Sequence, residues 1–153
     1  MSLTVAAATA AALIGSGLLA GVLFGVAVGV VPAFAAVPAE GYVALHRVVG
    51  VGFDRVMPHI VVITTALDLA VAWALPGPAR GLLLTAAALQ AGVSAVSQLG
   101  NVPINRAVRA LPDGDLPAGW ADPRARWRGW HLLRTTLALT ALAAHATAIV
   151  TLT

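Results

Sequence analysis

The fold is decided by an apolar run that carries no charge over residues 3–31, LTVAAATAAALIGSGLLAGVLFGVAVGVV. About 20 apolar residues in a helix cross roughly 30 Å of membrane hydrocarbon, so this run is long enough to span a bilayer. Working outward along the chain, three further apolar runs occupy about residues 58–75, 80–100 and 123–152. Together they predict a single membrane domain over residues 1–153, an all-α integral membrane four-helix bundle.

The composition supports a membrane protein and excludes several functions. The sequence is 59% hydrophobic and only 10% charged, which is far from the range of soluble domains. Its net charge of +3 is small and its arginines are scattered, so we expect contact with lipid headgroups and no binding of nucleic acid. The absence of cysteine excludes disulfides, thiolate nucleophiles and iron–sulfur clusters.

The two long connections, residues 32–57 and 101–127, follow the first and third spans and must lie on the same side of the membrane. Arg80 is the only arginine on the opposite side, whereas the long connections and their borders hold seven: Arg47, Arg55, Arg106, Arg109, Arg124, Arg126 and Arg128. The positive-inside rule therefore predicts a multi-pass protein of a plasma membrane, which we take to be bacterial, with cytoplasmic connections and both termini outside. Within the first connection, residues 40–56 predict a short interfacial helix before the second span.

Four glycines recur every four residues along the first span: Gly17, Gly21, Gly25 and Gly29. Such a stripe lets another helix approach the backbone closely. We favour packing within the chain, ahead of a homo-oligomer interface and of room for a flat ligand.

A polar stripe follows the third span at steps of three or four residues, formed by Gln90, Ser94, Gln98, Asn101 and Asn105 with Ser97 beside it. Lipid does not solvate such side chains, so the stripe must face protein or a cavity. Hydrogen bonds between helices and a substrate pocket open to the cytoplasm explain it equally well.

Trp127, His131 and Arg134 share one side of the fourth span, at i, i+4 and i+7. Tryptophans at the start of this span, among them Trp120 and Trp130, are typical of the headgroup region. Arg134 lies deeper and predicts an ion pair with Asp68 of the second span, because the pair would neutralise two costly charges. The alternatives for this pair are an anion clamp or a proton relay.

Three histidines, His46, His59 and His131, can converge at the cytoplasmic mouth of the bundle, with Asp54 as a carboxylate beside them. A site of this kind would hold iron or copper and suit oxygen chemistry. No His-x-x-His or Glu-x-x-His pair occurs, however, so acid–base or hydrogen-bonding roles for His131 are favoured over metal binding.

Several short motifs resemble one family. They are Asn101-Val-Pro-Ile-Asn105, then Trp127-x-x-Trp130-His131-x-x-Arg134-Thr135, and upstream Leu45-His46 and the run from Phe53 to Pro58. Their pattern is similar to the small four-helix membrane proteins grouped with anthrone oxygenases, some of which oxidise anthrones to anthraquinones in polyketide pathways. The resemblance implies functional roles for Asn101, Pro103, Asn105, Trp130, His131 and Arg134, and for His46 and Asp54. The family motif often has asparagine at the position of His131, so this chain leaves both a cofactor-free and a metal-assisted reaction open.

The sequence therefore predicts a membrane-embedded oxygenase or oxidase that acts on a lipophilic, activated aromatic substrate with dioxygen. His131 would remove a proton, Arg134 would stabilise the resulting anion, and His46 would assist. Gln98, Asn101, Asn105 and Trp130 would bind the substrate. The alternative is a non-catalytic helical subunit that binds lipid or a partner protein through its glycine stripe. A transporter or proton conductor that uses Asp68 and His145 is a third possibility.

Overall fold

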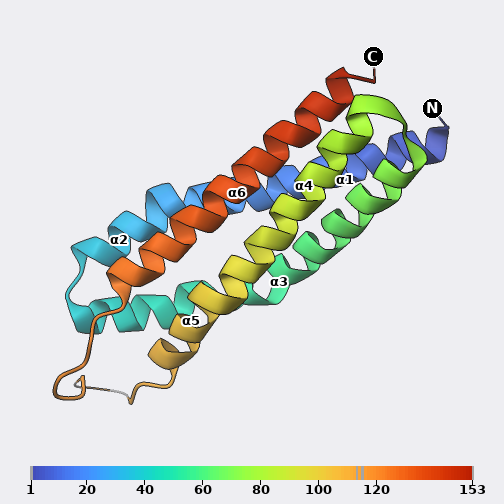
Figure 1. Cartoon of the computed structure of the whole chain (residues 1–153). Helices are drawn as coiled ribbons and strands as arrows, with labels where there is room; N and C mark the ends of the chain where they lie inside the picture. Colours follow the sequence, from blue (N-terminus) through green and yellow to red (C-terminus); the bar gives the residue numbers. More distant parts are fainter. Residues whose placement is uncertain (1, 113, 115, 153) are drawn as a thin grey trace.

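The computed structural model describes residues 2–112, 114 and 116–152, and within them it is a bundle of long helices without strands. Four helical columns, at residues 3–36, 39–74, 77–109 and 124–150, are long and apolar enough to cross a membrane. The predicted all-α four-helix architecture is confirmed. Both termini lie at the end of the bundle that also holds the turn between α3 and α4, as the topology prediction requires (Figure 1).

The first column consists of α1 (Leu3–Gly25), the π-helical turn η1 (Val26–Val30) and α2 (Val31–Ala36). Ser2 caps its start, where the Ser2 hydroxyl accepts a hydrogen bond from the Val5 amide. The π turn lies directly before Pro32, whose ring would clash with the carbonyl one turn earlier in a regular α-helix. A wider turn relieves that clash and lets the helix continue past the proline.

The third column repeats this arrangement. Helix α4 (Gly77–Val96) leads into the π turn η2 (Ser97–Asn101) and then into α5 (Val102–Arg109), with Pro103 just beyond the π turn. The sequence predicted a loop from Asn101 onward, and this boundary is wrong because the π turn accommodates the proline without ending the helix. The motif Asn101–Asn105 is consequently helical, and both asparagines point into the bundle.

Helix α3 (Ala39–Ala74) forms the second column without interruption. The segment 40–56 is helical as predicted, but it is continuous with the second span, and the expectation of a separate interfacial helix is wrong. Pro58 lies inside this helix and does not end it. The turn to α4 is only two residues long. Gly77, the first residue of α4, has a positive φ of 72°, which glycine adopts without steric cost.

The fourth column, α6 (Arg124–Val150), packs along α4 and also contacts α1, while α3 packs between α1 and α4. Three apolar clusters follow one another along the bundle. One surrounds Tyr42 and Trp127 near α2 and α5, one surrounds Leu19 and Val93 in the middle, and one surrounds Leu83 at the end with the termini.

The glycine stripe does not pack within the described chain. A Cβ atom added at Gly17, Gly21, Gly25 or Gly29 would meet nothing within 4 Å. The favoured expectation of packing within the chain is therefore wrong, and the homo-oligomer interface stays a prediction. The close helix contacts lie elsewhere, at Gly15 against Thr64 and at Gly100 against the ring of Trp130.

Candidate functional site

A cavity of about 540 Å³ lies between the four columns, in the half of the bundle that holds α2 and α5. Aliphatic side chains of α1, α3 and α4 form much of its lining, and its polar members come mainly from α3, η2, α5 and α6. Cavities of this size accept drug-sized molecules and bind them chiefly through apolar contacts with a few placed polar groups. The polar lining residues are His46, Asp54, Ser94, Ser97, Gln98, Asn105, Arg106, Arg109 and Arg134.

Arg134 reaches this cavity from α6, about 15 Å along the helix axis from Arg124. Its Nε and Nη2 atoms lie 3.1 and 2.9 Å from Nδ1 of His131, and its Nη1 lies 3.3 Å from the hydroxyl of Ser97. Both of these partners are uncharged acceptors. The predicted pair with Asp68 does not form.

Two hydrogen bonds determine the tautomer of His131. Arginine can only donate, so Nδ1 is the acceptor, and Nε2 lies 3.0 Å from the carbonyl oxygen of Leu23 and must carry the proton. His131 is thus neutral, completely buried and absent from the cavity lining. Because both ring nitrogens are engaged, the geometry favours a role in holding Arg134 over the predicted role of removing a proton.

His46 is the histidine that lines the cavity. Its ring packs against Phe34 and Trp127, with ring centroids 5.6 and 6.0 Å apart, and Tyr42 lies on a further side at 5.4 Å. Its buried Nδ1 has no hydrogen-bond partner among the described residues. His46 is therefore the histidine that forms part of the cavity wall, while its Nδ1 is buried within the protein.

The two asparagines of the motif hold Trp127 in place. Asn105 accepts a hydrogen bond of 2.8 Å from the indole Nε1, and Asn101 donates one of 3.1 Å to the backbone carbonyl of Trp127. Trp127 is also stacked on His131, with ring centroids 5.2 Å apart and planes only 5° from parallel. Asn105 still lines the cavity, whereas Asn101 is completely buried.

The tryptophans differ from the expectation of a headgroup belt. Trp127 is 6% exposed and forms part of the cavity wall, so the belt prediction is wrong for this residue. Trp130 packs on Gly100 and is absent from the cavity lining, so its contacts are those of a helix interface. The i, i+4 spacing of Trp127 and His131 was the signal that could have placed both inside the bundle.

The residues do not fit the predicted metal centre. No group of three histidine or carboxylate side chains in the described chain converges as a metal site would require. His59 is exposed, and its Nδ1 lies 3.0 Å from the carbonyl of Arg55 in the preceding turn. Asp54 forms an ion pair with Arg109, and the ring of His131 has no free nitrogen.

Asp68 belongs to a second polar cluster in the other half of the bundle. One of its oxygens lies 2.7 Å from Nε2 of His145, and the other accepts a hydrogen bond of 2.8 Å from the amide of Gln90. All three side chains are completely buried. The predicted Asp68–Arg134 pair is wrong, because each of these residues has other partners. The polar stripe is divided: Gln90 forms a hydrogen bond between helices, whereas Gln98 and Ser94 line the cavity.

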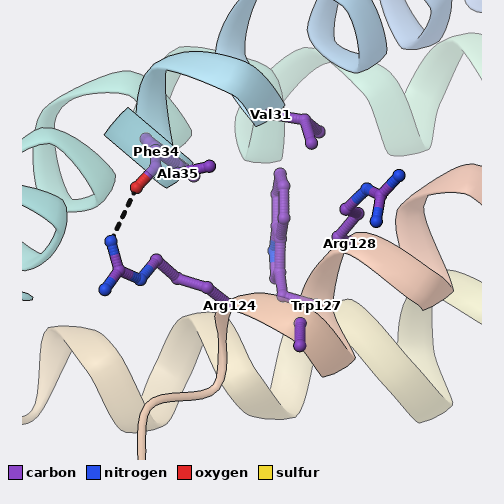
Figure 2. A pocket seen from close by; sticks show the side chains of 7 residues that line it. Val31, Phe34, Ala35, Arg124, Trp127 and Arg128 are labelled. Atoms are coloured by element: carbon purple, nitrogen blue, oxygen red, sulfur yellow. Dashed lines mark hydrogen bonds between the residues drawn. The ribbon is translucent and has the colours of Figure 1, made fainter. Parts of the chain in front are cut away.

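A smaller groove of about 260 Å³ lies between α2 and α6, and Phe34 and Trp127 line it as well as the larger cavity (Figure 2). Arg124 ties the two helices together there, since its Nη1 donates to the carbonyls of Phe34 and Val37 at 2.9 and 2.8 Å. The same guanidinium bonds to Asp122 and lowers the pKa of that carboxyl below its usual value. These contacts position the start of α6, and with it Trp127, against α2.

The fold defines a multi-pass helical membrane protein with a cavity between its helices. The sequence model of one family, anthrone oxygenase, matches residues 45–144. This stretch includes α4, α5 and most of α3 and α6, and the chain belongs to this family. Searches among curated proteins and among solved structures found no match to the chain.

Proposed function

We propose that this protein is a membrane oxygenase that uses dioxygen to oxidise a lipophilic aromatic molecule at an activated carbon. The observation that carries the proposal is the cavity itself, where a histidine and an arginine line a largely apolar space inside a protein of the anthrone oxygenase family. The substrate class follows from the family and from the aromatic wall formed by Phe34, His46 and Trp127.

The chemistry begins with removal of a proton from the substrate. A methylene carbon between aromatic rings is acidified when the resulting anion is delocalised onto an oxygen, and a nearby histidine is a suitable base. We assign this role to His46 because it is the histidine among the described residues that lines the cavity. Arg134 stabilises the negative charge on the substrate oxygen.

Dioxygen then reacts with the electron-rich anion. One electron passes from the anion to dioxygen, and the two radicals combine to a peroxide anion. This anion takes back the proton held by His46, and the resulting hydroperoxide loses water and leaves a ketone. In sum the methylene group and one O₂ give a carbonyl group and one H₂O, so no further reductant is needed. No step in this route passes through a metal, in agreement with the poor fit of the residues to a metal centre.

Gln98, Ser94 and Ser97 would orient substrate oxygens, since all three line the cavity and carry uncharged polar groups. Asn105 would contribute mainly through Trp127, which it holds by a hydrogen bond. We place the protein in a plasma membrane, with α5 and the start of α6 in the cytoplasm, because the arginines gather at that end. The substrate would then reach the cavity from the lipid or from the cytoplasmic face.

The test is oxidation of an anthrone by membranes that contain the protein, with oxygen uptake followed in parallel. His46→Gln should lower kcat by about a hundredfold, as expected for loss of a general base, while His59→Gln serves as a matched control that keeps wild-type activity. Activity should persist in a strong chelator. Wild-type rates in His46→Gln would contradict the assignment of the base, and oxygen uptake that stops with chelator would contradict the metal-free route.

A further inference from the structure

No carboxylate in the described part of the chain lies within ion-pair distance of Arg134, and Asp54, which also borders the cavity, attracts it only at longer range. The ion pairs there join Arg109 to Asp54, Arg124 to Asp122 and His145 to Asp68. The partners of Arg134 are the neutral groups of His131 and Ser97. An uncompensated charge in low-dielectric surroundings is costly, and in membrane proteins such groups commonly mark a functional site.

The guanidinium also has donors to spare. It carries five N–H groups, and the three contacts with His131 and Ser97 use three of them. Arg134 lines the cavity, which is where the remaining donors find space. A planar group with two free N–H donors matches the geometry of a carboxylate or a phenolate oxygen.

The charged residues of the cavity lining also favour an anionic ligand. The charged residues that border the cavity are one carboxylate, Asp54, and three arginines, Arg106, Arg109 and Arg134. Because Arg109 forms an ion pair with Asp54, the lining carries a net charge of two positive units. Arg106 is exposed near the mouth, whereas Arg134 lies deeper. The field inside the cavity is therefore positive, with its best-shielded charge at Arg134.

Aromatic rings form part of the same cavity wall. Phe34 and Trp127 have ring centroids 5.4 Å apart and planes inclined by 54°, and Phe34 and His46 have centroids 5.6 Å apart and planes inclined by 31°. Phe53 lines the cavity from α3 as well. Such a surface suits fused aromatic rings better than a flexible acyl chain, since rings stack with little loss of conformational freedom.

We propose that the cavity binds its ligand as an aromatic anion, with a carboxylate or phenolate on Arg134 and the rings against Phe34, His46 and Trp127. The proposal rests on the proposed function in that it names the substrate class of the same site. His131 is the positioning residue of this subsite. Its Nε2–H is anchored to the carbonyl of Leu23 in α1, and its Nδ1 holds two nitrogens of the guanidinium.

The experiment compares two probes that are not oxidised at an activated methylene, anthracene-9-carboxylate and the neutral anthracene-9-methanol. Both are titrated into the purified protein in nanodiscs of neutral lipid, and anthracene fluorescence reports binding. We expect the carboxylate to bind at least tenfold more tightly than the alcohol. Arg134→Gln should abolish this preference and keep the binding of the alcohol, while Arg126→Gln, an exposed arginine on the same helix, should change neither.

Equal affinities of the two probes for the wild-type protein would overturn the proposal without reference to any variant. A preference that survives in a folded Arg134→Gln protein would overturn the role of this residue. Myristate that displaces the aromatic carboxylate with equal affinity would show that an acyl lipid is the occupant and would overturn the aromatic assignment.

The same titration separates this proposal from the proposed function. Tight, Arg134-dependent binding of the carboxylate together with no oxidation of any anthrone would leave the anion site in place and remove the oxygenase. Oxidation of an anthrone without a preference for the anionic probe would do the reverse.

Discussion

The two buried polar clusters of this protein both contain a histidine of α6, yet their surroundings are opposite. The Asp68–Gln90–His145 cluster lies in the half with the termini, is completely buried and pairs its carboxylate with a histidine. The His131–Arg134 cluster lies beside the cavity, and the hydrogen-bond partners of its cation are neutral groups. A buried carboxylate in contact with a histidine and an amide ties helices together, whereas a cavity cation hydrogen-bonded only to neutral groups supports the proposed role of Arg134 in binding an anion.

The largest expected effect is a loss of stability when the Asp68–Gln90–His145 cluster is disrupted. Asp68→Ala removes the carboxylate and leaves both His145 and Gln90 buried without it, which should lower the free energy of unfolding by about 3 kcal/mol. Unfolding in mixed detergents, followed by circular dichroism, measures the loss. Arg134→Gln is the comparison variant. It should leave the free energy of unfolding unchanged or raise it, because it removes a partly buried charge that has no carboxylate in contact. Equal destabilisation by the two substitutions would contradict the distinction.

A smaller effect is expected at the residue that positions Arg134. His131→Phe keeps the ring packed on Trp127 and removes both hydrogen bonds, so kcat for anthrone oxidation should fall about tenfold if one oriented donor group is lost. His131→Gln retains one donor and one acceptor and should recover part of the rate. Preference for the anionic probe should fall in His131→Phe and return in His131→Gln. A base at this position would instead give equal loss in both variants.

The smallest effect on the folded chain is expected at the open glycine stripe. Gly21→Leu should leave unfolding unchanged, because an added side chain meets nothing within 4 Å there. If the stripe is a homo-oligomer interface, the same substitution abolishes self-association measured by energy transfer between labelled copies in liposomes. Gly15→Leu is the contrasting variant, since its side chain would collide with Thr64 and destabilise the monomer. Wild-type association in Gly21→Leu would remove the interface prediction.

Much of the architecture could be predicted because hydrophobic length is a local property. Apolar runs of about 20 residues predict spans wherever they occur, and the arginine bias sets their expected orientation. The sequence predicted helix boundaries at Asn101 and near Pro58, because proline normally ends a helix, and both boundaries are wrong. Here a π turn before Pro103 and the continuous course of α3 through Pro58 carry the helices onward.

The site was predicted in part. The polar stripe, His46 and Arg134 were identified from residue type and spacing, and most of them line one cavity. Their partners were not, because a helix presents side chains at a known angle but its rotation against other helices depends on packing. Asp68 and Arg134 lie at comparable depths from the same end of their spans, yet Asp68 contacts Gln90 of α4 and His145 of α6 instead.

The sequence by itself determined that this chain forms four apolar helices, that polar groups must be hidden between them and that it has no thiol chemistry, since these follow from composition and periodicity alone. Only the tertiary structure decided which histidine faces the cavity and which one holds Arg134. The reason is that a buried nitrogen acquires its role from the atom opposite it. For His131 these atoms are the Leu23 carbonyl and the Arg134 guanidinium, which lie 108 and three residues away along the chain.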